Sequence, residues 1–101
     1  MPRALTASRA TVPPGREADY VATLAQLGAR LRARGGHLWL FRDPGTPGAY
    51  LEFNESPSAQ GHLARRASDA EEAALEHRLE AIADYGPERR VLWEEVSLEE
   101  R

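Results

Sequence analysis

An α+β fold is predicted for this chain of 101 residues, and three observations predict it. Two apolar, aromatic-rich runs, 37–42 and 49–54, flank a segment of Asp, Pro, Gly and Thr, which is the pattern of a β-hairpin. Two longer segments, 16–34 and 68–85, carry apolar residues at helical spacing. Strand-like stretches, 4–12 and 90–96, lie toward the two ends. The order β-α-β-β-α-β therefore accounts for one domain, residues 1–101.

The first strand and helix follow from residue type and spacing. Residues 4–12 are small or β-branched, and Pro13-Pro14-Gly15 ends the strand. The helix over 16–34 places apolar residues on one stripe at intervals of about four and three, as an amphipathic helix does. These residues are Tyr20, Leu24, Leu27 and Leu31. Gly35-Gly36 then ends the helix.

The first strand of the hairpin is apolar without alternation. Its run is Leu38-Trp39-Leu40-Phe41. A strand that is apolar on both faces must be covered on both faces. The helices of the chain can cover one face, so we expect a second subunit to cover the other.

The rest of the chain predicts a helical region and a last strand. Residues 59–66 suit a short helix, and Ser68 with Glu71 fits a capping box at the start of a second long helix. That helix is expected to run to Tyr85, before the stop signal Gly86-Pro87. Residues 90–96 suit the final strand. This order predicts a ferredoxin-like fold, a four-stranded antiparallel sheet with two helices on one face.

Composition excludes several classes of function. A net charge of −3 and the absence of cysteine argue against nucleic-acid binding and thiolate or Cys–metal chemistry. All 13 basic residues are arginine, which excludes Schiff-base chemistry and a Walker-type phosphate loop. The histidines lack metal-ligand spacing, so no metal site is predicted. No apolar run approaches a membrane span and no signal segment opens the chain, so we expect a cytoplasmic protein.

Two motifs carry a family resemblance. They are Trp39-Leu40-Phe41-Arg42-Asp43-Pro44 and Gly48-Ala49-Tyr50-Leu51-Glu52-Phe53, followed by a serine and then His62-Leu63. The chain resembles the dimeric α/β-barrel superfamily, which includes antibiotic biosynthesis monooxygenase-like proteins. It looks most similar to the small domain appended to some major-facilitator efflux transporters. The resemblance implies a homodimer and, for an enzyme, a cofactor-free oxygenase acting on a small aromatic compound.

The candidate site residues are two histidines and four aromatic residues. An imidazole is a suitable general base near neutral pH, and the resemblance points to His62 for that role. We expect His77, Trp39, Phe41, Tyr50 and Phe53 to contact an apolar or aromatic ligand. The alternative for the aromatic residues is a place in the core and the dimer interface. The alternative for the whole protein is a non-catalytic module that binds a small ligand or a partner.

Overall fold

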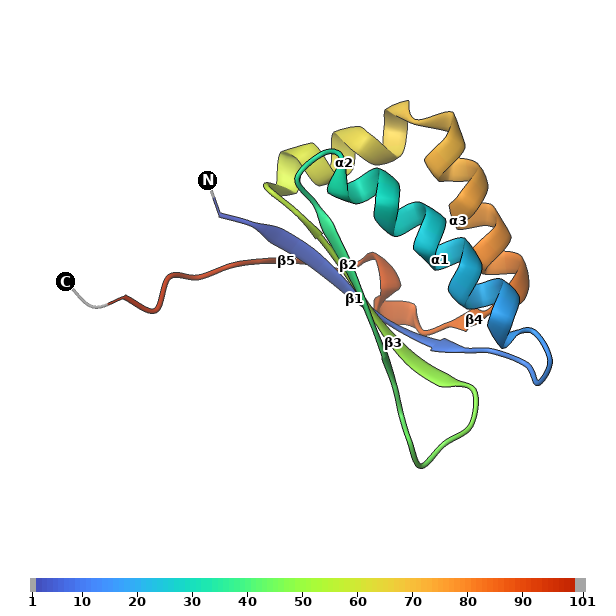
Figure 1. Ribbon diagram of the computed structural model, residues 1–101. Coiled ribbons are helices and arrows are strands. Elements are labelled where there is room, and N and C mark those ends of the chain that lie inside the picture. The colour runs from blue at the N-terminus through green and yellow to red at the C-terminus, as the bar shows by residue number, and fades with distance from the viewer. Residues whose placement is uncertain (1, 100–101) are drawn as a thin grey trace.

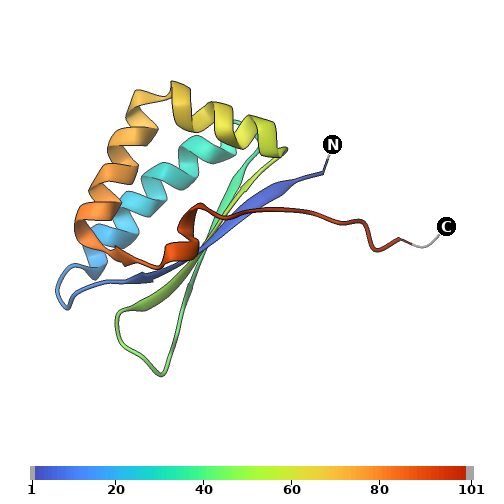
Figure 2. The same cartoon turned by 180° about the vertical axis from the view of Figure 1, so that it is seen from behind.

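The computed structural model describes residues 2–99, with side chains described for all of these except 64–68. Its elements are β1 (Ala4–Thr11), α1 (Glu17–Arg32), β2 (His37–Arg42), β3 (Ala49–Ser56), α2 (Ala59–Ser68), α3 (Ala70–Ile82), β4 (Asp84–Tyr85), a 3-10 turn (Pro87–Arg90) and β5 (Leu92–Glu94). All helices lie on one side of the sheet, and the other side is open (Figures 1 and 2).

The sheet is antiparallel and has four strand positions. Its order is β2-β3-β1, and both β4 and β5 pair with the remaining edge of β1. Ala10 lies opposite Tyr85 of β4, and Thr6 lies opposite Leu92 of β5. The short strands β4 and β5 therefore share the fourth position, separated by the 3-10 turn. The ferredoxin-like α+β fold predicted from the sequence is confirmed.

Helix α1 forms where its apolar stripe predicts. Its stripe residues Tyr20, Leu24, Leu27 and Leu31 are at most 4% exposed. Gly35, which follows the helix, adopts φ +80°, a conformation that favours glycine. A Cβ at Gly36 would lie only 2.7 Å from the Glu55 carbonyl oxygen, so glycine also permits the close approach to β3.

The start of α3 differs from the prediction by one residue. Asp69, not Ser68, is the N-cap, and its carboxylate accepts a hydrogen bond from the Glu72 backbone N–H. Since α2 continues to Ser68, the chain turns into the extended conformation only at Asp69. The hydrogen bond from the Glu72 N–H, followed by that from Arg30, lowers the pKa of the Asp69 carboxyl to about 2.

The end of α3 and the last strand also differ from the prediction. Helix α3 ends at Ile82, and Tyr85, expected on the helix, pairs with β1 instead. The strand expected over 90–96 is shortened to Leu92–Glu94. Asp84 and Tyr85 pair with β1, so the helix ends before them. The 3-10 turn that begins at Pro87 then separates this short strand from β5.

Alternation along the strands gives the sheet two distinct faces. The inner face, toward the helices, carries Ala4, Thr6, Ser8, Ala10, Leu38, Leu40, Tyr50, Glu52, Asn54 and Ser56. The outer face carries Leu5, Ala7, His37, Trp39, Phe41, Leu51, Phe53 and Trp93. The run in β2 is thus apolar on both faces, as predicted: Leu38 and Leu40 pack against the core, and Trp39 and Phe41 point outward.

Candidate functional site

The inner face of the sheet is unusually polar at its centre. Thr6 and Ser8 on β1 are 7% and 4% exposed, and Glu52 on β3 is 7% exposed. Glu52 lies opposite Ser8, so both side chains point toward the helices. Burying an ionisable carboxyl costs free energy unless it is well hydrogen-bonded, which makes Glu52 the first candidate for chemistry.

Two tyrosines converge on one oxygen of Glu52. The hydroxyl of Tyr20, from α1, donates to Glu52 Oε2 at 2.5 Å, and that of Tyr85, from β4, donates to the same oxygen at 2.6 Å. Burial raises the pKa of Glu52, although these hydrogen bonds act in the opposite direction. Burial and the Glu52 charge raise the pKa of both tyrosines, so their hydroxyls stay protonated as donors.

His62 is buried beside this network. It lies in the first turns of α2, is 2% exposed, and has Nδ1 at 2.8 Å from Ser56 Oγ. The hydroxyl therefore fixes the orientation of the imidazole ring. In the tautomer where Nδ1–H donates to Ser56, Nε2 is the basic nitrogen.

Glu52 and His62 line the same small cavity between the helices and the sheet. The cavity measures about 20 Å³. Its lining residues are Thr6, Ser8, Leu27, Glu52, Asn54, His62, Glu76, Leu79 and Arg89. This volume holds about one water molecule. The cavity thus joins a carboxyl and an imidazole, two groups able to exchange protons.

Arg89 supplies positive charge to this cavity. Its guanidinium carbon lies 4.0 Å from the centre of the Tyr85 ring, and its Nη1 lies 3.2 Å from Glu80 Oε2. The Arg89 charge favours ionised Glu52, whereas the Glu76 charge disfavours it. Arg89 therefore fixes Tyr85 through a cation–π contact and partly offsets the cost of the buried carboxylate.

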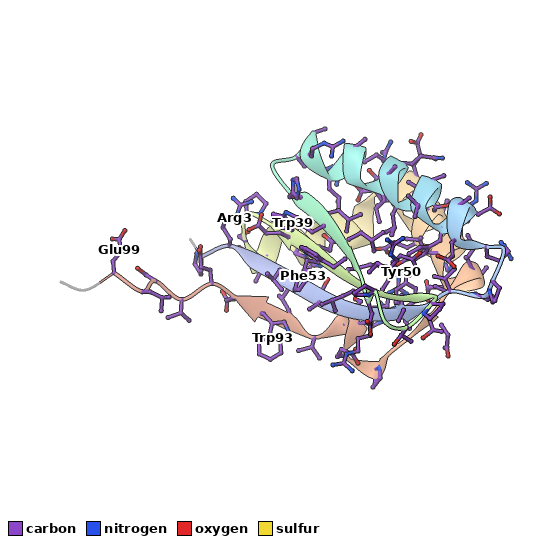
Figure 3. All side chains as sticks on the ribbon, turned by 60° about the horizontal axis from the view of Figure 1, so that its bottom comes forward. Arg3, Trp39, Tyr50, Phe53, Trp93 and Glu99 are labelled. Atoms are coloured by element: carbon purple, nitrogen blue, oxygen red, sulfur yellow. The ribbon has the colours of Figure 1, made fainter. Side chains whose placement is uncertain are left out.

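The residues predicted from the sequence separate into three places. His62 lines the inner cavity, whereas Trp39, Phe41 and Phe53 lie on the outer face of the sheet and so are separated from it. Figure 3 shows Trp39, Phe53 and Trp93 extending from β2, β3 and β5. His77 is exposed on α3.

Tyr50 belongs to the inner face. Its ring centre lies 5.1 Å from that of Tyr20, and its hydroxyl donates to Glu17. That hydrogen bond raises the pKa of the Tyr50 hydroxyl. Tyr50 also helps to line a groove of about 440 Å³ near the hairpin, together with Phe41 and the arginines Arg9 and Arg42. This groove brings together two of the predicted ligand-binding residues, Phe41 and Tyr50.

The outer face exposes an aromatic surface. Trp39, Phe41 and Trp93 are 39%, 54% and 59% exposed. The rings of Phe41 and Phe53 meet edge to face at 5.7 Å between centres, and those of His37 and Trp39 lie 4.1 Å apart. A contiguous apolar surface of this kind is typical of an interaction site.

Sequence reasoning missed Glu52, Arg89 and the shared role of Tyr20 and Tyr85. Tyr20 was interpreted as part of an apolar helix stripe, and Tyr85 as the end of the second long helix. A signal was present in β3, where Glu52 alternates with the outward-facing Leu51 and Phe53 and so had to face the helices. No sequence pattern indicated that Arg89 would reach the same cavity.

No metal site and no membrane span are found in the described part of the chain. Among residues 2–99, no group of three His, Cys, Asp or Glu side chains is placed to hold a metal ion. No described helix is both long and apolar enough to cross a membrane.

Comparison with known proteins gives matches in structure but not in sequence. No protein-family model and no curated protein matches the chain. The solved structure of SnoaB, a cofactor-independent oxygenase from Streptomyces nogalater, is similar with a TM-score of 0.74 at 14% identity, over 99% of this chain and 97% of that one.

Two further solved structures show the same architecture. A protein from Bordetella bronchiseptica, described as a candidate antibiotic biosynthesis monooxygenase, has a TM-score of 0.68 at 21% identity, over 96% of this chain and 100% of that one. A protein of unknown function from Bacteroides thetaiotaomicron, described as a possible oxidoreductase, has a TM-score of 0.75 at 12% identity, over 92% and 95% of the two chains. The chain therefore has the ferredoxin-like α+β fold of antibiotic biosynthesis monooxygenase-like proteins.

Proposed function

We propose that this protein is a homodimeric, cofactor-independent oxygenase that oxidises a small aromatic compound at the inner cavity. The observation that carries the proposal is Glu52, a buried carboxyl with a raised pKa that shares a cavity with the imidazole of His62. Ionisable groups perturbed by burial and gathered at one cavity are typical of active sites. The solved cofactor-independent oxygenase with the same fold supports this class of reaction.

Each residue has a role in the proposed reaction. His62, oriented by Ser56, removes a proton from an activated CH₂ group of the aromatic substrate. The carbanion gives its electrons to O₂ and forms a C–O bond, which yields a peroxide. The first proton returns to the outer peroxide oxygen and gives a hydroperoxide. His62 then removes the second C–H proton, that electron pair forms the C=O bond as the O–O bond breaks, and the leaving hydroxide takes up this proton to become water. One CH₂ and one O₂ thus give one C=O and one H₂O, so the substrate supplies all the electrons.

Glu52 is the second ionisable group of the cavity. Tyr20 and Tyr85 hold its Oε2 in place, and burial raises its pKa above that of an exposed carboxyl. We assign to Glu52 the stabilisation of the positive charge that forms on His62 during proton removal.

The volume of the cavity favours a second candidate function. A site for a drug-sized ligand usually measures at least about 300 Å³, whereas this cavity measures about 20 Å³. An aromatic substrate must therefore displace side chains around the cavity. If it does not enter, the chain is a non-catalytic module, and the groove of about 440 Å³ beside Phe41 and Tyr50 is the place for a ligand.

The homodimer is proposed to form through the outer face of the sheet. The exposed rings of Trp39, Phe41 and Trp93 are too apolar for a surface that faces water. Packing two outer faces together removes these rings from water, and a stable homodimer interface usually buries at least about 1,500 Å² in total. Light scattering at micromolar concentration should give twice the subunit mass, and a clean monomer would contradict this part of the proposal.

Oxygen uptake tests the enzymatic part. The protein is mixed with polycyclic phenols that carry an activated CH₂ group, and O₂ consumption and carbonyl product are measured together. Removing a general base costs roughly 10²-fold in rate or more, so His62→Ala should abolish most turnover. Glu52→Gln should lower kcat, because it removes the charge that stabilises the protonated imidazole.

Matched variants control for general damage. Gln60→Ala changes an exposed residue of the same helix as His62, and Glu99→Gln changes an exposed carboxylate far from the cavity (Figure 3). Both should keep full turnover. Saturable binding of the phenols without O₂ uptake, measured by calorimetry, would select the non-catalytic module. Turnover that survives His62→Ala would remove His62 from the mechanism.

A further inference from the structure

The inner face of the sheet gathers every tyrosine of the chain. The sequence contains three, Tyr20, Tyr50 and Tyr85. Ala10 of β1 lies opposite Tyr50 of β3 on one side and Tyr85 of β4 on the other, so both rings share its face of the sheet. Tyr20, from α1, completes the group, because its ring centre lies 5.1 Å from that of Tyr50. Three residues far apart in sequence thus meet in one buried cluster.

Each tyrosine hydroxyl donates to a carboxylate. Tyr20 and Tyr85 donate to Glu52 Oε2 at 2.5 and 2.6 Å. Tyr50 donates to Glu17. A phenol gives up an electron readily only when its hydroxyl proton leaves as well, and a carboxylate held against the hydroxyl can accept that proton. Every member of the cluster is therefore arranged to lose an electron and a proton together.

The tyrosines are the easily oxidised side chains of the inner face among the described residues. The side chains that lose an electron most readily are those of tyrosine, tryptophan, cysteine and methionine. The chain contains no cysteine, and its one methionine is residue 1. The two tryptophans, Trp39 and Trp93, lie on the outer face (Figure 3). An oxidising species formed in the inner cavity therefore meets the tyrosines first.

We infer that the three tyrosines form a redox relay that conducts oxidising equivalents from the inner cavity to the surface. The source of these equivalents rests on the proposed oxygenase, because the first electron that a carbanion gives to O₂ leaves a carbon radical and superoxide. If the superoxide escapes, the carbon radical binds another O₂ and becomes a peroxyl radical, which is a one-electron oxidant. A relay that reduces this radical protects His62 and the rest of the cavity from it.

Each step balances electrons and protons. Tyr20 gives an electron to the peroxyl radical and its hydroxyl proton to Glu52. The reduced peroxide takes the proton that His62 removed from the substrate and becomes the hydroperoxide of the proposed reaction. Tyr50 then gives an electron to the Tyr20 radical and its own proton to Glu17, while Glu52 returns its proton to Tyr20. A soluble reductant such as ascorbate finally gives an electron to the Tyr50 radical, and Glu17 returns the proton.

Tyr50 is the exit of the relay because it reaches the surface. Tyr20 is 0% exposed, whereas Tyr50 is 8% exposed and helps to line the groove of about 440 Å³ near the hairpin. Ser56, whose hydroxyl contacts His62, lies at the other end of β3, about 20 Å along the strand from Tyr50. The relay therefore ends away from the proposed general base, where a soluble reductant has access.

A photo-oxidant attached beside the cavity tests the relay without substrate. The chain contains no cysteine, so Leu63→Cys gives a single attachment site at an exposed residue next to His62. A ruthenium polypyridyl complex on this cysteine, excited by a flash and oxidised by an external quencher, withdraws one electron from the protein. Transient absorption should detect a tyrosyl radical whose decay is accelerated by ascorbate. In Tyr50→Phe the radical should still form, but the acceleration by ascorbate should be largely lost.

Two carboxylate variants separate a relay from a structural hydrogen bond. Glu17→Gln keeps an oxygen that accepts the Tyr50 hydrogen bond but cannot take up the proton, so the reaction with ascorbate should slow at least about tenfold. Asp19→Asn, which changes an exposed carboxylate of the same helix, should react as the labelled parent protein does. Equal rates in Glu17→Gln and Asp19→Asn would overturn the inference.

Removing both tryptophans tests the route. Trp39→Phe with Trp93→Phe should keep the yield of tyrosyl radical, because the outer face takes no part in the relay. Loss of the radical in this variant, or no tyrosyl radical in the labelled parent protein, would overturn the inference. Light supplies the oxidant and no substrate is present, so these results do not depend on turnover. A protein that takes up no O₂ yet passes the oxidising equivalent to Tyr50 would overturn the proposed oxygenase and support the relay.

Discussion

The two faces of the sheet are specialised in opposite ways. The inner face, covered by helices, carries Thr6, Ser8 and Glu52 at its centre, all less than 9% exposed. The outer face, open in the subunit, carries Trp39, Phe41 and Trp93, all more than a third exposed. An antiparallel sheet with one covered face usually shows the reverse pattern, apolar inside and polar outside. The difference teaches that neither face is arranged for the stability of the isolated subunit, which agrees with the proposed chemistry on the inner face and the proposed association on the outer face.

The inner face remains stable because apolar packing surrounds its polar centre. Leu24, Leu27 and Leu31 from α1 and Leu79 from α3 belong to one buried cluster. Glu52 and His62 lie at the margin of this cluster, where Glu52 accepts hydrogen bonds from two tyrosine hydroxyls and His62 is hydrogen-bonded to the Ser56 hydroxyl. Residues of the apolar cluster, of the polar centre and of the outer face should therefore respond differently to mutation.

The largest effect is expected in the apolar cluster. Leu79→Ala removes a side chain that is 1% exposed, so it should lower the free energy of unfolding by about 2–4 kcal/mol. Leu24→Ala, at 4% exposed, should fall in the same range. Urea unfolding followed by circular dichroism gives both values. Effects below about 0.5 kcal/mol for both variants would mean that the cluster does not hold the helices on the sheet.

A smaller effect is expected from the polar centre. Tyr20→Phe keeps the ring but removes one of the two hydroxyls that donate to Glu52 Oε2. Leaving a buried acceptor short of a partner costs about 1–3 kcal/mol, so unfolding should become easier by that amount at pH 7. Thr46→Val, in the exposed turn between β2 and β3, is the control and should change little. An unchanged stability of Tyr20→Phe would show that Glu52 is satisfied without this hydroxyl.

Removing the charge on Glu52 should increase the free energy of unfolding. Burial raises the pKa of Glu52 in the folded protein above its ordinary value of 4.5, so the folded state binds this proton more tightly than the unfolded state. The wild type therefore loses stability as the pH rises from about 4.5 through the raised pKa. Glu52→Gln avoids this loss, since an amide oxygen still accepts from the tyrosines and carries no charge.

Unfolding at several pH values measures this gain. Glu52→Gln should be more stable than the wild type at pH 7, and the two curves should converge near pH 4, where the carboxyl is protonated in both states. Thr46→Val, which changes no ionisable group, should follow the wild type at every pH. A variant that is less stable at neutral pH would contradict a raised pKa at Glu52. A gain in stability together with the loss of turnover is the trade-off expected at an active site.

The sequence predicts the elements of the inner and outer faces well where periodicity is strong. The α1 stripe from Tyr20 to Leu31 is buried as predicted, and the unalternating run Leu38–Phe41 presents apolar side chains on both faces of β2, because side-chain period follows directly from backbone geometry. The covering of its outer face by a second subunit stays a prediction. The end of α3 was missed, because pairing of Tyr85 with β1 depends on contacts distant in sequence. The cap was missed by one residue, since Ser68 and Asp69 are both good caps.

The candidate site was only partly predictable. His62 was selected as a base, and it lines the inner cavity; its catalytic role stays a prediction. Its neighbours come from separate strands and helices, and their convergence is a property of the fold that no local spacing encodes. Trp39 and Phe53 were expected beside it because aromatic residues suit both pockets and interfaces. Their assignment to the outer face depends on which residues of β2 and β3 point away from the helices, and only the strand pairing fixes that.

The smallest effect on the subunit itself is expected on the outer face. Trp93→Ser changes a ring that is 59% exposed, so the isolated subunit should lose only about 0.5 kcal/mol. Its dimer should be at least about tenfold weaker, because the ring is removed from the proposed interface. Dimer formation makes the unfolding midpoint rise with protein concentration, and this rise should shrink in Trp93→Ser. Val21→Ser, which changes an exposed apolar residue on α1, should keep the full dependence. An equal response of Trp93→Ser and Val21→Ser would mean that the aromatic outer face does not drive association.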